Sequence, residues 1–449
     1  MTQGLSVLSH SVYRQVVQQC AAFPNNQRVL GLSGGLDSVA LLHLLHQLRE
    51  VEHFELKAIY VHHGLSQYAD DWLTFCQQLC QHLHIDFVSE RVNLGDVQGE
   101  SIEALARKAR YQTFAKHLPI GGQLLTAQHQ NDQVESFLLA AKRGSGVKGL
   151  SGMPMIKAFQ HGTHLRPLLN VPRDALAALA EQMNWTWIED DSNSNSQFDR
   201  NFLRLNVIPA LVERWPSAVS AISRSARLCG EQQALLDELL TDDLNQCLRA
   251  DLAFNIAGVT TYSEQRQLAL LRLWIAKQNQ YAPSEVRLKE IWHNVALARA
   301  DAQPMLCFKH YQIRRFLGHL YLTPGQGAEF DQTSTVPLLL DQVNTLPCGK
   351  TLTLSSTNQG ARITMPNTEL TVGYQLAGST KLTPAGRHGS RSYKKLLQEY
   401  QVPPWLRASI PIIFAGKQVV AVGDLFICQQ WFARGSEVGF EIKLTDNRC

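Results

Sequence analysis

Residues 33–38 read Ser-Gly-Gly-Leu-Asp-Ser, and this loop limits the possible folds of the chain more than any other feature. It stands between a predicted buried strand at 28–32 and a predicted apolar helix at 38–48. Backbone N–H groups at the start of a helix favour an anion, and two glycines let the backbone approach a phosphate closely. The serine hydroxyls can donate hydrogen bonds, and Asp37 can hold Mg²⁺. The loop therefore predicts a nucleotide-phosphate site.

Strand-like and helix-like segments alternate on both sides of this loop. The predicted strands are 28–32, 56–61, 86–94 and 123–127, and the predicted helices include 38–48, 102–114 and 131–142. Such alternation is typical of βαβ units, so we expect an α/β fold with a Rossmann-like parallel sheet.

The chain is too long for one ordinary core, since it has 449 residues. We expect an N-terminal catalytic domain at 1–215, a mainly helical domain at 216–325 and a small α+β C-terminal domain at 336–449.

Composition narrows the class of protein. The net charge is only +3, which does not by itself require a nucleic-acid partner. No apolar run approaches the length of a membrane span, and the first residues lack the pattern of a signal peptide. None of the nine cysteines forms a Cys-x-x-Cys pair, and Cys76 and Cys80 are spaced as core thiols on one helix face. A cytoplasmic protein without membrane contact is expected.

The loop at 33–38 is not a Walker A motif, because no Gly-Lys-Ser/Thr follows, and it is not Gly-x-Gly-x-x-Gly. A glycine turn before a helix is the simpler alternative. The pattern SGGxDS resembles the loop of N-type ATP pyrophosphatases, the PP-loop superfamily. That resemblance implies attack on the α-phosphate of ATP, release of pyrophosphate and an adenylated intermediate.

Four further stretches resemble, in order and spacing, segments of the long bacterial tRNA(Ile)-lysidine synthases. They are 61–65 (VHHGL), 101–114 (SIEALARKARYQTF), 126–153 and 190–209, the last through Asp190, Ser192, Asn193, Arg200, Asn201 and Arg204. The resemblance extends through the middle region to the C-terminal domain. One departure is Asn131, which stands beside Asp132 where many members of the family have a second acid.

Two charged pairs in these stretches have both a functional and a simpler interpretation. Arg107 and Arg110 are three residues apart, so they could grip a phosphate together, or they could be solvated arginines on an outer helix face. Asp132 and Glu135 have the same spacing. They could bind a cationic amine such as free lysine, or merely complement the helix dipole.

Basic residues elsewhere suit a polyanion. Arg200 and Arg204 could hold tRNA or ATP phosphates, or form a salt bridge between domains. A loop with Arg143 and Gly144 follows the helix of the acidic pair. Segment 381–407 holds six Lys or Arg residues and one acid, as expected of a surface for a phosphate backbone. Trp405 in that segment could stack on a base or, as we favour, anchor the core.

The family resemblance implies a ligase that joins free L-lysine to the 2-carbon of the wobble cytidine in the CAU anticodon of tRNA(Ile). The products would be lysidine, AMP and pyrophosphate, and codon reading would change from AUG to AUA. ATP and Mg²⁺ are implied, and both a monomer and a homodimer stay open. The implied catalytic residues are Asp37, Asp132 and Glu135. The implied ATP-binding residues are Ser33, Gly34, Gly35, Leu36, Asp37, Ser38, His62, Arg143 and Gly144, with Asp37 on Mg²⁺. The implied substrate-binding residues are Arg107, Arg110, Asp132, Glu135, Arg200, Arg204, Arg387, Arg391, Lys394 and Lys395.

Three alternative functions remain at this stage. A tRNA thiolase of the same superfamily would need catalytic cysteines, for which Cys76 and Cys80 are the nearest candidates. A small-molecule amide ligase would need no basic C-terminal surface. A non-enzymatic RNA-binding module would have no use for Asp37.

Overall fold

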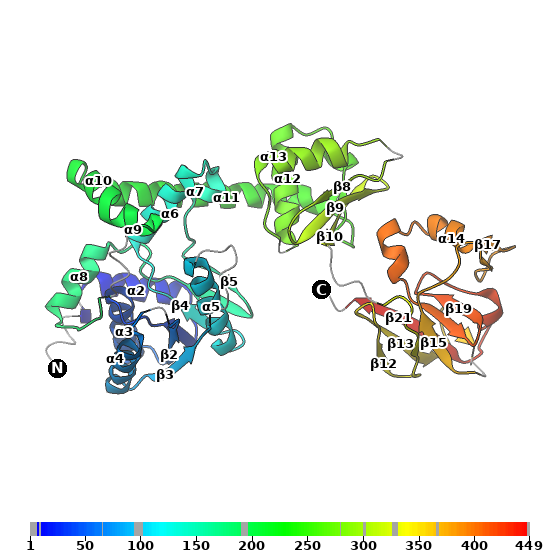
Figure 1. Cartoon of the computed structure of the whole chain (residues 1–449), viewed down its shortest axis with the longest axis horizontal. Helices are drawn as coiled ribbons and strands as arrows, with labels where there is room; N and C mark the ends of the chain where they lie inside the picture. The colour runs from blue at the N-terminus through cyan, green and yellow to red at the C-terminus, as the bar shows by residue number, and fades with distance from the viewer. Residues whose placement is uncertain are drawn as a thin grey trace. The chain divides into compact units, whose positions relative to one another are not determined.

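The computed structural model describes residues 7–8, 10–64, 66–93, 102–189, 196–278, 280–299, 302–325, 331–364 and 368–446. Of the predicted motif residues, Ser101, Asp190, Ser192 and Asn193 lie outside these ranges. The chain divides into two compact units, Met1–Thr241 and Asp242–Cys449. Helix α11 (Ala218–Cys247) runs from the first unit into the second (Figure 1). The three domain ranges expected from the sequence stay predictions.

A six-stranded sheet forms the centre of the first unit, in the order β3-β2-β1-β4-β6-β5. Neighbouring strands are parallel, except that β5 runs antiparallel to β6. The strands are β1 (Gln27–Gly31), β2 (Glu55–His62), β3 (Asp86–Arg91), β4 (Gln123–Leu125), β5 (Ile156–Phe159) and β6 (Gly162–Leu165). The predicted α/β fold with a largely parallel sheet is confirmed for this part of the chain.

Helices cover both faces of this sheet. One face packs on α3 (Leu36–Arg49), whose leucines are buried all round because α2 (Ser11–Ala22) and α8 (Arg173–Gln182) lie outside it. The other face packs on α5 (Ile102–His117) through Phe114. The remaining helices are α4 (Ala69–His82), α6 (Gln130–Lys142), α7 (Val147–Leu150), α9 (Asp199–Phe202), the π-helical turn η2 (Leu203–Val207) and α10 (Ile208–Arg214).

The start of the second unit combines helices with a sheet. The buried Trp274 of α12 (Glu264–Lys277) packs on Phe254 of that sheet. The other helical elements are η3 (Ala257–Val259), α13 (Glu285–Glu290) and the π-helical turn η4 (Ile291–Ala296). The antiparallel strands are β7 (Phe254–Asn255), β10 (His319–Pro324), β9 (Tyr311–Phe316) and β8 (Met305–Cys307), in that order. The region expected to be mainly helical therefore also holds a four-stranded sheet, since the alternating apolar residues near 305–322 form strands.

The C-terminal part is rich in antiparallel strands. One sheet orders β11 (Val336–Pro337), β15 (Leu370–Gly373), β18 (Ile412–Ala415), β19 (Gln418–Val422) and β20 (Phe426–Ile427). A second orders β12 (Val343–Thr345), β13 (Lys350–Thr357), β21 (Gly439–Asp446) and β14 (Ile363–Thr364). Smaller elements are β16 (Lys381–Leu382), β17 (Arg391–Ser392), α14 (Tyr393–Glu399), η5 (Pro404–Ser409) and η6 (Gln429–Trp431). Apolar side chains between the two sheets form one core.

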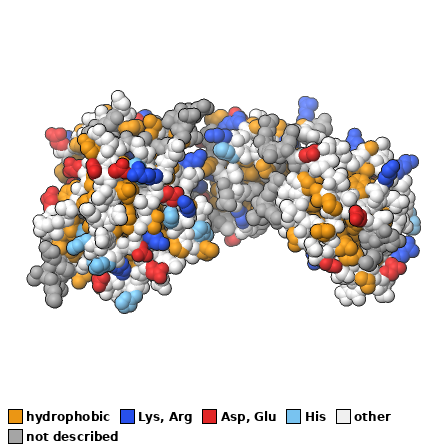
Figure 2. Space-filling model, turned by 60° about the horizontal axis from the view of Figure 1, so that its bottom comes forward, with side chains coloured by type: hydrophobic (Ala, Val, Ile, Leu, Met, Phe, Trp, Pro, Cys, Tyr) orange, Lys and Arg blue, Asp and Glu red, His pale blue; other side chains and the backbone are white. Residues whose placement is uncertain are grey.

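Two observations on the described residues agree with the composition. No helix among the described residues is long and apolar enough to cross a membrane. On the face drawn in Figure 2, acidic and basic side chains are interspersed rather than gathered into one field of a single sign. The small net charge thus reflects a mixed surface, at least on that face.

A partly buried histidine of α3, His43, makes stability depend on pH. The His43 ring stacks on Trp185 at 4.5 Å, and burial lowers its pKa to about 4. Because the folded state then binds this proton less readily than the unfolded chain, stability falls as pH drops from about 6.5 towards 4. We expect His43→Phe, which keeps a ring against Trp185, to reduce the loss of unfolding free energy between pH 7 and pH 5 by about 1–2 kcal/mol. Urea unfolding at both pH values measures this loss. The exposed His53→Phe is the control, and an equal pH slope in both variants would contradict the assignment.

Candidate active site

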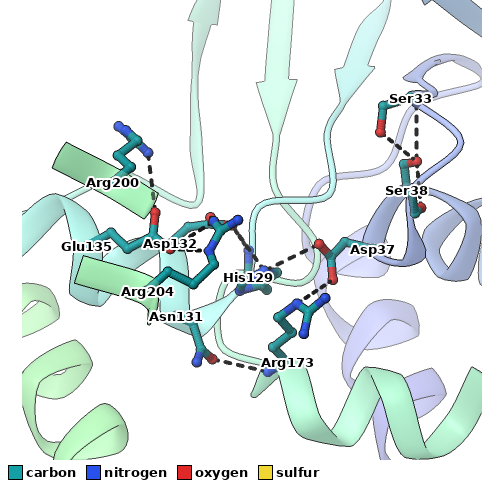
Figure 3. A network of polar contacts seen from close by, with 11 residues as sticks. Ser33, Asp37, Ser38, His129, Asn131, Asp132, Glu135, Arg173, Arg200 and Arg204 are labelled. Atoms are coloured by element: carbon teal, nitrogen blue, oxygen red, sulfur yellow. Dashed lines mark hydrogen bonds and ion pairs between the residues drawn. The ribbon is translucent and has the colours of Figure 1, made fainter. Parts of the chain in front are cut away.

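The topology of the sheet brings several charged side chains together beyond the carboxyl ends of its strands. The chain moves from β1 to β2 and β3 on one side, and β4 and β6 lie on the other side of β1. Ligands of open α/β sheets bind at such a switch point, beyond the carboxyl ends of the strands. Asp37 follows β1, His129 follows β4 and Arg173 follows β6. Figure 3 shows these residues converging from different elements.

The loop at 33–38 is held in shape by its own serines. Ser38 Oγ accepts a hydrogen bond from Ser33 N at 3.2 Å and donates one to the Gly35 carbonyl at 3.0 Å. The two serine hydroxyl oxygens lie 3.1 Å apart. The φ angle of Gly34 is +85°, which favours glycine. These hydrogen bonds fix the conformation of the loop at the start of α3, where free N–H groups favour an anion.

Ile188 and Cys76, which are distant in sequence, lie against this loop at Gly34. Ile188 N donates to the Gly34 carbonyl at 2.9 Å. A Cβ on Gly34 would come within 2.9 Å of Ile188 Cδ1 and 3.1 Å of Cys76 Sγ. A side chain at this position would therefore disturb both the packing and the backbone angle, so the loop needs glycine here for two independent reasons.

His129 connects two acids of the site. Its Nε2 lies 3.4 Å from Asp37 Oδ2 and 3.6 Å from Asp132 Oδ2. Its backbone N–H donates to Asp132 Oδ2 at 2.8 Å, which caps the start of α6. Burial opposes a charge on this ring, but the nearby carboxylates raise its pKa above the ordinary value. The ring therefore favours its cationic form between the two acids.

Glu135 is fully buried and is neutralised by arginine. Arg204 Nε donates to Glu135 Oε1 at 2.9 Å, and Arg204 Nη2 lies 3.5 Å from Asp132 Oδ1. Arg200 Nη1 is 3.9 Å from the other Glu135 oxygen. Burial, aided by the charge of Asp132, raises the pKa of Glu135 although Arg204 opposes the shift. In this structure Arg200 and Arg204 thus face the acidic pair, and a role on tRNA or ATP phosphates stays a prediction.

Asp37 has the character of a cation ligand. Burial opposes its ionisation, but His129, Arg173 and Arg204 together hold its pKa below the ordinary value. Its Oδ1 is buried without a hydrogen bond among the described residues, and Arg173 Nε lies 3.9 Å from it. An ionised carboxylate with an unused oxygen beside a phosphate-binding loop fits Mg²⁺, which takes one or two carboxylates together with substrate phosphates.

The histidines after β2 lie on the other side of the phosphate loop. His62 is buried, and its Nε2 is 3.3 Å from Asp70 Oδ1. Both ring nitrogens of His63 are buried, and neither has a hydrogen-bond partner within the part of the chain that the structure describes. Burial, reinforced by the charge of Arg110, lowers the pKa of His63 to about 4, so this ring is neutral. Arg110 therefore lies near this end of the sheet, whereas Arg107, one turn earlier on α5, lies over the Tyr111 ring at 5.0 Å.

The other predicted basic residues lie on exposed segments. Arg143 and Gly144 end α6 in an exposed turn, where Gly144 has a φ angle of +66°. In the second unit, described by itself, Arg387 and Arg391 both pair with Glu399. Lys394 and Lys395 are exposed on α14 and form no ion pair among the described residues. Their predicted roles stay predictions.

Sequence analysis did not select His129 and Arg173 as site residues. His129 follows β4 as His62 ends β2, so its position after a strand was an available signal. Arg173 begins α8 after β6, but β6 was not among the predicted strands. Asn131 contacts the start of α8, since its Oδ1 accepts a hydrogen bond from Arg173 N at 3.2 Å.

The coupling between Arg204 and Glu135 can be measured as a double-mutant cycle. Arg204→Met would leave a buried carboxylate without its main counter-ion, so we expect a loss of about 3 kcal/mol of unfolding free energy at pH 8. The double variant Arg204→Met/Glu135→Gln should recover most of that loss, because no buried charge remains. Chemical denaturation of the three variants and the wild type gives the coupling. Additive single effects would contradict the pairing.

Comparison with known proteins agrees with this geometry. A PP-loop domain model matches residues 8–211, a model of the TilS substrate binding domain matches 254–321, and one of the TilS substrate C-terminal domain matches 370–444. Among solved structures, the U34-tRNA thiolase NcsA from Methanococcus maripaludis covers 49% of this chain and 78% of its own at 19% identity. Its TM-score is 0.42, too low to support an argument.

Curated relatives cover almost all of the sequence. The tRNA(Ile)-lysidine synthase of Vibrio parahaemolyticus is 45% identical over 92% of this chain and 95% of its own. That of Enterobacter sp. (strain 638) is 42% identical over 93% and 97%, and that of Vibrio campbellii is 43% identical over 95% and 98%. The PP-loop domain implies use of ATP. The chain belongs to the tRNA(Ile)-lysidine synthase family.

Proposed function

We propose that this protein joins free L-lysine to the 2-carbon of the wobble cytidine of tRNA(Ile) with a CAU anticodon, at the expense of ATP. The observation that carries the proposal is that a loop suited to phosphate and an acidic pair lie beyond the carboxyl ends of two neighbouring strands. The loop joins β1 to α3, and the acidic pair lies on α6, which follows β4. The site can therefore hold a nucleotide polyphosphate and an amine close together.

The first step activates the base. The cytidine 2-oxygen attacks the α-phosphorus, a new O–P bond forms, and the bond to the β-phosphate breaks to release pyrophosphate. The N–H groups at the start of α3 and the hydroxyls of Ser33 and Ser38 would hold the phosphates. Asp37 would hold Mg²⁺, whose charge, when bound, balances that of the polyphosphate.

The second step brings in the amine. The lysine side-chain nitrogen attacks the 2-carbon, and the bond from that carbon to oxygen breaks as AMP leaves. Asp132 and Glu135 would receive the incoming ammonium, since both carboxylates lie on one side of α6. Glu135 would accept the proton, because burial raises its pKa and a general base is most effective when its pKa is near the working pH.

In this second step Arg204 would have to move away from the acidic pair. Its guanidinium already occupies the position beside both carboxylates where a lysine ammonium would bind. Two cations cannot share that place, so lysine would displace Arg204. The arginine would thus keep the buried acids neutralised until the amine arrives.

The burial of the two candidate thiols argues against the thiolase alternative. Cys76 and Cys80 are completely buried in the core of the first unit, and burial raises the pKa of each to about 12. Catalytic cysteines instead occupy sites that lower the pKa. Cys76 lies beneath the phosphate loop as a packing residue.

The reaction can be tested with radiolabelled lysine, ATP, Mg²⁺ and an unmodified tRNA(Ile) transcript with a CAU anticodon. We expect label in the RNA that survives alkaline washing, because lysine bonded to a base resists the conditions that hydrolyse an ester. A transcript with uridine at the wobble position is the control and should stay unlabelled. Absence of label from the cytidine transcript, or equal label in both, would refute the proposal.

The acidic pair can be tested by Asp132→Asn. Loss of one carboxylate charge should raise the KM for lysine by about tenfold or more, equivalent to roughly 1.4 kcal/mol or more, with a smaller effect on the KM for ATP. Asp174→Asn, in the exposed first turn of α8, is the matched control. An unchanged lysine KM in Asp132→Asn would remove this residue from the lysine site.

A further inference from the structure

A second cavity lies in the C-terminal part of the chain, described within the second unit alone. Its volume is about 450 Å³, within the range of small-ligand sites. Tyr374, Tyr393 and Leu397 form its buried wall, and Gln332, Gln375 and Arg407 are among the residues of its more exposed rim. This combination of an apolar wall with a few converging polar groups is characteristic of a specific binding site.

One residue of the buried wall carries a polar atom without a hydrogen-bond partner among the described residues. The Tyr393 side chain is 6% exposed, and its hydroxyl is buried with no hydrogen bond among the described residues. A buried hydroxyl without a partner costs about 1–3 kcal/mol. A ligand oxygen or nitrogen that accepts a hydrogen bond from this hydroxyl would remove that cost, so binding of such a ligand is favoured.

One cationic side chain, Arg407, lines the cavity. Its Nε donates to the Val402 carbonyl at 3.1 Å, and its charge acts on Tyr393. No acidic residue lines the cavity among the described residues. The ligand should therefore carry negative charge.

We propose that this cavity receives one unpaired nucleotide of the tRNA. The base would lie against the apolar wall, with hydrogen bonds from the Tyr393 hydroxyl and the two glutamine amides, while Arg407 would face its phosphate. Unpaired bases are the part of an RNA that proteins read by such contacts. The inference rests on the proposed function, because it takes tRNA as the substrate.

Two substitutions in the full-length protein test this site. Ala408→Trp fills the cavity from its exposed rim, and Tyr393→Phe removes only the hydroxyl. We expect the Kd for the tRNA(Ile) transcript to rise at least tenfold with the tryptophan and about fivefold with the phenylalanine, close to the cost of one hydrogen bond. Ser436→Trp, in an exposed turn outside the cavity, should bind tRNA like the wild type.

The RNA used in the binding assay separates this inference from the reaction. Binding is measured without ATP or lysine, so the result does not depend on lysine incorporation. A blunt duplex RNA has no unpaired nucleotide, and its Kd should be the same in all variants. The inference is overturned if either variant binds tRNA like Ser436→Trp, or if duplex binding weakens equally. Where melting shows that Ala408→Trp is unfolded, Tyr393→Phe decides alone. Failure of the wild type to bind tRNA would overturn the proposed substrate as well.

Discussion

The buried carboxylate of Glu135 is the constraint around which the site is built. A carboxylate without solvent exposure is costly unless it is paired, and Arg204 provides the main counter-charge. The alternation of charges continues through Asp132 and His129 to Asp37. This chain of contacts links the π-helical turn η2, α6 and α3, which come from distant parts of the sequence (Figure 3). The acids at the centre therefore fix the relative positions of the elements that carry them.

The parallel sheet makes this arrangement possible. Its strands are held by apolar layers on both faces, so their carboxyl ends form a rigid edge. The phosphate loop leaves that edge at β1 and the acidic helix leaves it at β4, next to each other. The strand order thus places the loop proposed to bind phosphate beside the acidic pair proposed to bind an amine. In the proposed reaction this proximity brings the activated base to the amine.

Much of the first unit could be predicted from local sequence. The apolar run before residue 33 predicts a buried strand, and the two glycines after residue 33 predict the start of a helix. β1 and α3 confirm both predictions. The i, i+3 spacing of Asp132 and Glu135 likewise predicted that they share a helix face. The ion pairs of these acids could not be predicted, because Arg204 is 69 residues from Glu135 in sequence and reaches it only through the tertiary fold. Arg173 was missed because β6, the strand before it, was not predicted: its sequence Gly-Thr-His-Leu contains no apolar run.

The proposed reaction requires the lysine ammonium to replace Arg204 on the acidic pair. A crystal structure of the protein soaked with L-lysine tests this replacement most directly. We expect lysine Nζ within hydrogen-bonding distance of both Asp132 and Glu135, with the Arg204 guanidinium withdrawn from Glu135. Lysine bound elsewhere, with the contact between Arg204 and Glu135 intact, would contradict the claim.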